Sequence, residues 1–347
     1  MNISFGSDNH AGVHPEVLIA LSQANQGQVP AYGDDPWTRE ACEKIALLFG
    51  GGEVFLTLNG TGSNVLALRS VLKPWEAVVA PDCAHIHTDE TGAPESAGIK
   101  ILTLTQEKGK ILPDQITKYL GFLGNLHHVQ PRILSFSQTT ELGTLYTPEE
   151  VKILTEEAHK AGLLVHMDGA RLANACAELG VSPGVLTREA GVDILSFGAT
   201  KNGALGAEAV IFFTPGLSTG FEMLRKQHLQ LSSKMRFVAA QFLALLKNDL
   251  WLENARIANA MAKCLGKGLE LINKKFLPRP RMLNLAYPIQ ANALFVYLPK
   301  VAGDLLQKEF PFYWWDESTA LARWMTSFST TESQVDTFLK RLEELLA

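Results

Sequence analysis

Leu163-Leu164-Val165-His166-Met167-Asp168-Gly169-Ala170-Arg171 is the stretch from which the fold of this chain can be worked out. Its first five residues form an apolar run with the length of a buried β-strand. Upstream, Thr147-Pro148-Glu149-Glu150 is a capping box that predicts the start of a helix, and Gly162 marks the end of that helix. The register of the strand Leu163–Met167 follows, and it places Asp168 just past the carboxyl end, where open α/β sheets bind ligands.

Six other short apolar runs alternate with helical patterns between about residues 50 and 215. This alternation is typical of a parallel sheet covered by helices on both faces. We therefore expect an α/β fold with a mainly parallel, seven-stranded sheet. The other predicted strands are Val54–Leu58, Ala77–Ala80, Ile99–Leu104, Arg132–Phe136, Ile194–Phe197 and Ala209–Phe213.

The pattern changes beyond about residue 215. Long helices are predicted over roughly 219–247 and 253–275, followed by strands near 293–298 and 322–327 and a last helix from about 331. Pro278-Arg279-Pro280 predicts a turn or a sheet edge, because proline lacks the backbone donor that a central strand needs. These elements indicate a smaller α+β domain at the C-terminal end of the chain.

The length of 347 residues is typical of two domains. We expect an N-terminal arm over residues 1–15, a large domain over 16–250 and a small domain over 251–347. The arm carries little periodicity and is expected to lie over another surface, with a neighbouring subunit as one option. The aromatic segment Phe310-Pro311-Phe312-Tyr313-Trp314-Trp315 is expected to be core, with a pocket or an interface as the alternative.

Composition narrows the class of partner. The chain is 46% hydrophobic, has a net charge of −5 and carries no block of like charges, so neither nucleic acid nor an anionic membrane is an expected partner. No window reaches the ~18 apolar residues of a membrane-spanning helix, and the first residues lack a signal-peptide pattern. We expect a cytoplasmic protein that acts on a small molecule.

The four cysteines have neither the paired spacing of a zinc site nor the density of a disulfide framework. We expect them to be free thiols, most of them buried. Cys83 lies two residues from His85, so a nucleophilic cysteine is an alternative. The four are Cys42, Cys83, Cys176 and Cys264.

A lysine gives the predicted ligand site its chemistry. Lys201 follows an apolar strand in the run Ser196-Phe197-Gly198-Ala199-Thr200-Lys201-Asn202-Gly203, whose glycines leave room for a flat ring. A lysine that can form a Schiff base, together with Asp168 to face a pyridine nitrogen, is the arrangement of a pyridoxal-phosphate (PLP) enzyme. Arg171 can bind a carboxylate through two parallel hydrogen bonds. The alternative for Asp168 is an ordinary helix N-cap.

The loop after the first predicted strand suits a phosphate group. In Asn59-Gly60-Thr61-Gly62-Ser63-Asn64 the glycines let the backbone approach an anion, and a helix N-terminus supplies free N–H groups. The alternative is a glycine-rich connection without a ligand. The loop has neither a nucleotide-triphosphate motif nor a dinucleotide fingerprint, which disfavours a nicotinamide dehydrogenase.

His85 lies in Cys83-Ala84-His85-Ile86-His87-Thr88-Asp89-Glu90, after the predicted strand Ala77–Ala80. Its imidazole can stack on a cofactor ring or accept a proton, and the alternative is a loop histidine bonded to its neighbours. Metal binding by His85, His87 and Glu90 is a third option, but no further ligand cluster accompanies them, and we expect no metal ion.

Taken together, these stretches resemble the L-threonine aldolase group of fold type I PLP enzymes, within the aromatic amino-acid lyase and threonine aldolase superfamily. The resemblance extends over nearly the whole chain. The most specific element is Ala31-Tyr32-Gly33-Asp34-Asp35-Pro36, which matches a Tyr-Gly-Asp-Asp-Pro hallmark of that family. The other matching elements, in the family's order, are Ser7-Asp8, Gly60-Thr61, Ala84-His85 with Glu90, the stretch around Asp168, and Lys201.

The resemblance implies a role for each matching residue. Lys201 would form the Schiff base with PLP, His85 would stack on the ring, Asp168 would pair with the pyridine nitrogen, and Gly60 and Thr61 would hold the phosphate. Ser7, Arg171 and Arg323 would bind the substrate carboxylate. Lys234 and Arg236 would reach the phosphate of a neighbouring subunit, which implies a homo-oligomer, with a tetramer favoured over a dimer. The second catalytic histidine of the family matches His127 or His128, and His128 is taken as the candidate.

The expected reaction is retro-aldol cleavage of L-threonine, L-allo-threonine or a related β-hydroxy-α-amino acid such as phenylserine, to glycine and an aldehyde. The base would be His85, or a water held by His85 and the second histidine. A PLP-dependent β-eliminating lyase that acts on an aromatic or sulfur amino acid is the alternative. A non-catalytic PLP-fold protein is less consistent with an intact set of Lys201, Asp168 and Arg171.

Overall fold

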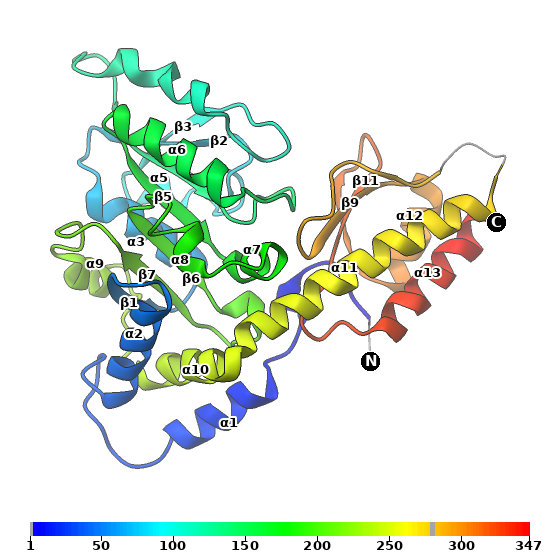
Figure 1. Cartoon of the computed structure of the whole chain (residues 1–347), viewed down its shortest axis with the longest axis horizontal. Coiled ribbons are helices and arrows are strands. Elements are labelled where there is room, and N and C mark those ends of the chain that lie inside the picture. The colour runs from blue at the N-terminus through cyan, green and yellow to red at the C-terminus, as the bar shows by residue number, and fades with distance from the viewer. Residues whose placement is uncertain (1–2, 278–281) are drawn as a thin grey trace.

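The computed structural model describes residues 3–277 and 282–347, so Pro278-Arg279-Pro280 lies outside the described residues. Figure 1 shows two bodies, each built on its own β-sheet, with the long helix α11 (Leu250–Lys275) running from one to the other. Among the described helices, none combines the length and the apolar character needed to cross a membrane.

The larger body is organised around a seven-stranded sheet in the order β1-β7-β6-β5-β4-β2-β3. Neighbouring strands pair in parallel except around β7, which is antiparallel to both β6 and β1. All seven predicted strands are present, and the expected α/β class with a mainly parallel sheet is confirmed. The strands are β1 (Glu53–Thr57), β2 (Glu76–Pro81), β3 (Lys100–Leu104), β4 (Gln130–Ser137), β5 (Leu164–Gly169), β6 (Ile194–Gly198) and β7 (Glu208–Phe212).

Helices cover this sheet on both sides, and α3 packs against β5, β6 and β7 (Figure 1). The helices of the larger body are α1 (Pro15–Ala24), α2 (Pro36–Leu48), α3 (Gly60–Val71), α4 (His85–Thr88), α5 (Ala93–Ser96), α6 (Pro148–Lys160), α7 (Leu172–Leu179), α8 (Pro183–Leu186), α9 (Phe221–Gln227) and α10 (Arg236–Leu246). Short 3-10 turns occur at η1 (Asp8–His10), η2 (Pro113–Phe122), η3 (Thr200–Asn202) and η4 (Lys247–Asp249).

The capping box before β5 forms as predicted. The Thr147 hydroxyl accepts the Glu150 N–H at 3.2 Å, and the Glu150 carboxylate accepts the Thr147 N–H at 2.7 Å. Gly162 follows the helix with a positive φ of 76°, a conformation that favours glycine. One detail differs from the prediction. Asp168 lies within β5 rather than past it, because its backbone is paired with both neighbouring strands.

The predicted helix over 219–247 is wrong, because the chain forms two helices, α9 and α10, with a break between them. Leu229 in the break has a positive φ of 63°. The side-chain carbonyl of Gln230 accepts the Leu58 N–H at 3.0 Å, which anchors the break to the end of β1. A hydrogen bond to a distant strand therefore overrides a continuous helical pattern. The second long helix is present as α11, from Leu250.

The smaller body is a four-stranded antiparallel sheet in the order β10-β11-β9-β8, packed against helices. Two of its strands were predicted, whereas the short strands β8 and β10 were not. α11 contributes to both hydrophobic cores, with Trp251 and Ala255 in the larger and Met261 and Leu265 in the smaller. The elements are β8 (Asn284–Leu285), β9 (Ala293–Tyr297), α12 (Lys300–Glu309), β10 (Tyr313–Asp316), β11 (Leu321–Met325) and α13 (Glu332–Leu346).

The N-terminal arm packs against its own chain rather than lying free for a neighbouring subunit. Phe5 is fully buried in the smaller core, and its backbone pairs with Pro311 at 2.8 Å and with Met325 at 2.8 Å. The arm then passes the larger sheet on its way to α1 (Figure 1). Both bodies are thereby held together by the arm as well as by α11.

The aromatic segment divides between core and surface. Phe310 and Phe312 are buried in the smaller core, as expected, whereas Tyr313 and Trp315 are 48% and 41% exposed. The cysteines are free thiols, but the expectation that most are buried is wrong. Only Cys176 is buried, and the other three are partly exposed.

Candidate active site

A cavity of about 360 Å³ opens between the two bodies. It receives side chains from the arm, from the carboxyl ends of β2, β4, β5 and β6, and from the edge of the smaller sheet. Five residues predicted from the sequence therefore line one space. The lining residues are Ser7, Asn9, Cys83, His85, Thr88, Asp89, Glu141, Arg171, Lys201, Trp315 and Arg323.

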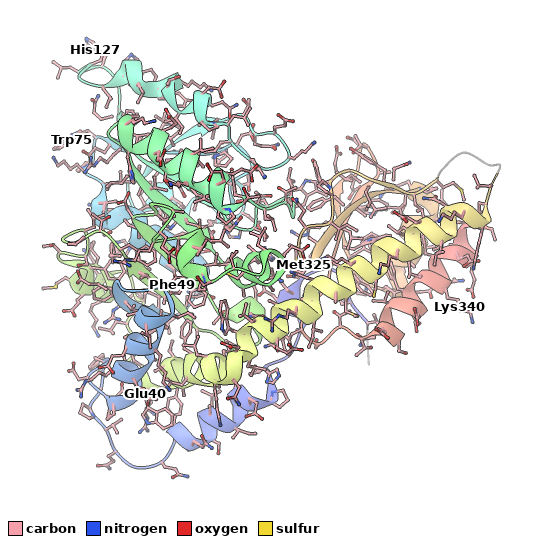
Figure 2. All side chains as sticks on the ribbon, in the orientation of Figure 1. Glu40, Phe49, Trp75, His127, Met325 and Lys340 are labelled. Atoms are coloured by element: carbon pink, nitrogen blue, oxygen red, sulfur yellow. The ribbon has the colours of Figure 1, made fainter. Side chains whose placement is uncertain are left out.

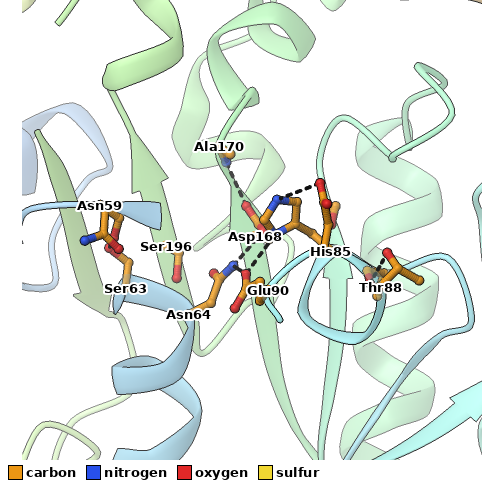
Figure 3. A network of polar contacts seen from close by, with 12 residues as sticks. Asn59, Ser63, Asn64, His85, Thr88, Glu90, Asp168, Ala170 and Ser196 are labelled. Atoms are coloured by element: carbon orange, nitrogen blue, oxygen red, sulfur yellow. Dashed lines mark hydrogen bonds and ion pairs between the residues drawn. The ribbon is translucent and has the colours of Figure 1, made fainter. Parts of the chain in front are cut away.

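Asp168 lies next to this cavity in a network of polar contacts (Figure 3). Its carboxylate accepts the Ala170 N–H at 2.9 Å and the Asn64 side-chain amide at 2.8 Å. Burial acts to raise the pKa of Asp168, but the charges of His85 and Lys201 and the hydrogen bonds from Ala170 and Asn64 together lower it. Asp168 is therefore ionised and held in one orientation.

His85 begins α4 and points toward Asp168 in Figure 3. Its Nδ1 lies 2.8 Å from the buried Glu90 carboxylate, and its Nε2 lies 3.6 Å from the exposed Asp89 carboxylate. The hydrogen bond with Glu90 raises the pKa of His85, and the charge of Asp168 acts in the same direction. The site thus favours the imidazolium form of His85.

The predicted metal set of His85, His87 and Glu90 does not come together as one cluster. His87 is exposed and is not part of the cluster that forms, which consists of His85, Glu90 and Asp168. The side-chain NH₂ of Asn64 donates to Glu90 at 2.9 Å as well as to Asp168. This NH₂ group therefore bridges the two carboxylates.

Lys201 lies in η3, directly after β6. Burial, with the charge of Arg171 second, lowers the pKa of Lys201. A lowered pKa increases the fraction of neutral amine, which is the form that attacks an aldehyde. Gly198 allows close packing here, since a Cβ at this position would meet the Ala170 backbone at 2.8 Å.

The glycine-rich loop forms the N-terminus of α3. Asn59 is its N-cap and accepts the Gly62 N–H at 2.8 Å. Among the hydrogen bonds of the described residues, none uses the N–H of Gly60 or of Thr61. These two first-turn donors remain available to an anion, as the sequence predicts.

Two arginines approach the cavity from different bodies. Arg171 is bound by the Asp8 carboxylate through Nε at 2.6 Å and Nη2 at 3.0 Å. Arg323 donates from Nη2 to the Gly6 carbonyl at 3.2 Å and lies within 5.5 Å of the ring centroids of Tyr313 and Trp315. Burial, with the charge of Arg171 second, lowers the pKa of Arg323. Both guanidinium groups bring positive charge to the cavity, and Asp8 already engages the Nε and Nη2 atoms of Arg171.

Some predicted residues lie outside the cavity. His128 is exposed and stacks on Phe122, with ring centroids 4.3 Å apart. Its neighbour His127 is at the outer edge of the larger body in Figure 2, whereas Met325, which contacts Arg171, lies between the bodies. Neither histidine lines the cavity of its own chain, and the role of a second catalytic histidine stays a prediction.

Lys234 and Arg236 also lie away from the cavity of their own chain. Lys234 is exposed, and Arg236 donates to the Gly27 carbonyl at 3.2 Å. In the nearby hallmark stretch, Asp35 is the N-cap of α2, and its carboxylate accepts both the N–H and the hydroxyl of Thr38 at 2.8 Å. The hallmark thus has a structural role in starting α2.

The structure adds residues that the sequence interpretation did not single out as functional. Asn64 joins Asp168 to Glu90, Asp8 holds Arg171, and Glu141 lines the cavity. Glu141 follows β4, whose carboxyl end lies at the same sheet edge as Asp168. The rule that ligands bind at this edge contains the signal that would have found it.

Cys83 lines the cavity, but its environment argues against a nucleophile. Burial, with the Glu141 carboxylate second, raises the pKa of Cys83. The group is therefore a neutral thiol, and thiolate is the reactive form.

The residues present fit PLP. An ionised, fixed Asp168 suits a protonated pyridine nitrogen, and the amine of Lys201 shares the cavity with His85. The unused N–H groups of Gly60 and Thr61 suit a phosphate.

Comparisons with known proteins agree with this geometry. A family model described as beta-eliminating lyase matches residues 4–288. The low-specificity L-threonine aldolase of Pseudomonas sp. strain NCIMB 10558 is 40% identical over 95% of this chain and 94% of its own length. The low-specificity L-threonine aldolase of Pseudomonas aeruginosa is 40% identical over 98% of this chain and 95% of its own length.

A solved structure of Leishmania major threonine aldolase superposes with a TM-score of 0.92 at 32% identity. The match covers 99% of this chain and 100% of that one. The resemblance found in the sequence is thereby confirmed. The chain belongs to the beta-eliminating lyase family, alongside low-specificity L-threonine aldolases.

Proposed function

We propose that this protein is a PLP-dependent aldehyde-lyase that cleaves L-threonine, L-allo-threonine and related β-hydroxy-α-amino acids, phenylserine included, to glycine and an aldehyde. One observation carries the proposal. Lys201, Arg171, Arg323 and His85 line one cavity beside Asp168, in a chain 40% identical to low-specificity L-threonine aldolases over most of its length.

Lys201, Asp168, His85 and the N–H groups of Gly60 and Thr61 would hold the cofactor. When bound, PLP supplies an electron sink for the negative charge left on Cα when a bond to that carbon breaks. The ionised carboxylate of Asp168 would stabilise the positive charge of a protonated pyridine nitrogen beside it. This interaction is stronger in a buried site than in water. The protonated imidazole of His85 suits the predicted role of stacking on the cofactor ring.

The two arginines would orient the substrate. A carboxylate bound between Arg171 and Arg323 fixes the Cα end of the amino acid, with Ser7 at the same wall of the cavity. Such a grip decides which of the bonds to Cα is aligned for cleavage. The remaining length of the cavity then receives the β-hydroxyl group and its substituent.

The assembly is a further part of the proposal. We propose a homotetramer in which Lys234 and Arg236 contribute to the phosphate site of a neighbouring chain. Lys234 is exposed and Arg236 is partly exposed, near the hallmark stretch and away from the cavity of their own chain. We also propose a division into a large domain over 16–250 and a small domain over 251–347, to which the two separate cores lend support.

The test is to incubate the purified protein and PLP with L-threonine, L-allo-threonine and phenylserine and to measure glycine and aldehyde. We expect glycine release that Lys201→Ala abolishes. Pyruvate and ammonia from an aromatic or sulfur amino acid, with no glycine from any β-hydroxy amino acid, would instead identify a β-eliminating lyase. PLP binding without turnover of either class would identify a non-catalytic protein.

A further inference from the structure

Glu141 presents its carboxylate to the cavity from the segment that follows β4. One oxygen, Oε1, is fixed, since it accepts the Ser137 hydroxyl at 2.6 Å and the His85 N–H at 2.9 Å. The other oxygen, Oε2, has the Cys83 thiol at 3.9 Å, and a thiol is a weak donor. Oε2 therefore keeps acceptor capacity for a hydroxyl group in the cavity.

The charges around the cavity define which end of a substrate meets Glu141. Among the described residues that line the cavity, two carry carboxylates, Glu141 and Asp89. The Asp89 side chain is 79% exposed, so water weakens its effect on a bound substrate. Arg171 and Arg323 attract the substrate carboxylate, whereas Glu141 repels it. An amino acid bound to the arginines thus keeps its negative end away from Glu141 and its polar side chain free to reach Oε2.

The other candidate for the base is poorly suited to accept a proton. The hydrogen bond that the His85 imidazole donates to the Glu90 carboxylate raises the pKa of His85 and favours its protonated form. Burial raises the pKa of Glu141, even though hydrogen bonds from Ser137 and the backbone oppose this effect. A carboxylate with a raised pKa is a stronger base than an ordinary surface carboxylate.

We propose that Glu141 is the catalytic base for the β-hydroxyl group, with Oε2 accepting its proton. This inference rests on the proposed aldolase function. The O–H bond breaks as the proton moves to Oε2, the C–O bond becomes the aldehyde C=O, and the Cα–Cβ bond breaks with its electron pair left on Cα. Uptake of one proton by Cα, with loss of one from Glu141 to solvent, balances the conversion to glycine and aldehyde.

The test compares Glu141→Gln with the wild type in three measurements. These are the cofactor absorbance and glycine affinity, the exchange of glycine α-hydrogen in D₂O followed by NMR, and the pH dependence of kcat/KM for L-threonine. Glycine has no β-hydroxyl group, so its exchange does not need a base at that position. Glu149→Gln is the matched control, because Glu149 is exposed on α6.

We expect Glu141→Gln to bind PLP and glycine like the wild type and to exchange the glycine hydrogen within about threefold, while threonine cleavage falls by roughly 10²- to 10⁴-fold. The wild-type kcat/KM should rise with pH as Glu141 loses its proton, and the variant should lack this acidic limb. Glu141→Asp should keep the acidic limb of the pH profile and lose less of the cleavage rate. If Glu141→Gln does not bind PLP, the pH profile of Glu141→Asp provides the test of the proposed base.

Two results would overturn the inference. One is cleavage by Glu141→Gln within a few-fold of the wild type with the acidic limb intact. The other is an equal loss of glycine exchange and threonine cleavage, which would indicate a structural role. Failure of the proposed function looks different, because the wild-type protein itself would then release no glycine from threonine.

Discussion

Asp8 and Arg171 form a two-point ion pair across the boundary between the arm and the larger body, with contacts of 2.6 and 3.0 Å. Asn292 of the smaller body donates to the same carboxylate at 3.2 Å. Burial acts to raise the pKa of Asp8, but the charge and hydrogen bonds of Arg171, the charge of Lys201 and the hydrogen bond from Asn292 together lower it. Asp8 therefore links the arm to both bodies and holds the orientation of Arg171, the arginine that would bind the substrate.

Asp8→Asn should weaken both the fold and substrate binding. The variant leaves a partly buried guanidinium without its counter-charge, which we expect to cost about 2 to 3 kcal/mol in unfolding free energy. The KM for threonine should rise at least about tenfold, equivalent to ~1.4 kcal/mol. Urea unfolding and steady-state kinetics measure the two effects. Asp336→Asn, at an exposed position on α13, is the control, and equal behaviour of both variants would refute the role of Asp8.

Arg323→Lys tests the second arginine. Lysine keeps the charge but loses the planar fork and the stacking on Tyr313 and Trp315. We expect KM to rise by about tenfold or more, with a smaller change in kcat, because a carboxylate contact present before and during the reaction is weakened. Arg256→Lys on the exposed face of α11 should leave KM unchanged. An unaltered KM in Arg323→Lys would show that this arginine does not contact the substrate.

Asp168→Asn should separate cofactor binding from turnover. The asparagine can keep the contacts with Asn64 and Ala170 in modified form, so we expect the yellow cofactor to remain bound. Without the carboxylate, the positive charge on the pyridine nitrogen loses its partner, and kcat should fall by at least about 10²-fold. Absorbance spectra and single-turnover assays measure the two properties. Full activity in this variant would mean that the pyridine contact has been assigned to the wrong residue.

Glu208 predicts a pH dependence of stability. Burial raises the pKa of Glu208 to about 7, although hydrogen bonds with Thr200 and the charge of Lys201 oppose the rise. Between its ordinary pKa of 4.5 and about 7, the unfolded chain has lost this proton while the native protein retains it. The native state binds more protons in this window, so the contribution of Glu208 to stability falls as the pH rises.

Glu208→Gln removes this effect. The quantity to compare is the unfolding free energy of the apoprotein variant minus that of the wild-type apoprotein. We expect this difference to increase by up to about 3 kcal/mol between pH 5 and pH 8. Thermal and urea unfolding at the two pH values provide the measurement. A difference between variant and wild type that is the same at pH 5 and pH 8 would contradict the assignment.

Much of the fold was predictable from local patterns. Buried parallel strands are continuous apolar runs, and the capping box before β5 fixed where one of them begins, so Asp168 and Lys201 could be placed at one sheet edge. The break between α9 and α10 was not predictable in this way, because it depends on a hydrogen bond between Gln230 and Leu58, distant in sequence. The short strands β8 and β10 have too few residues to show a period.

The site was predictable where a residue follows a clear strand and has an unusual neighbour, as with Arg171 beyond Asp168. Glu141 was predictable in principle, because it follows β4 and ligands bind at the carboxyl edge of such a sheet. Asp8 was missed because its role depends on how the arm packs between two bodies, and no local pattern encodes that path. His128 lies outside the cavity of its own chain, a position that could not be predicted because motif order does not determine which way a loop turns.

The central claim is that Lys201 forms a covalent C=N bond with PLP, and chemical trapping tests it most directly. The protein is loaded with PLP, reduced with borohydride, digested and mapped by mass spectrometry. We predict one pyridoxyl group, carried by the peptide that contains Lys201 and absent from Lys201→Ala. A pyridoxyl group on another lysine, or labelling that persists unchanged in Lys201→Ala, would contradict the claim.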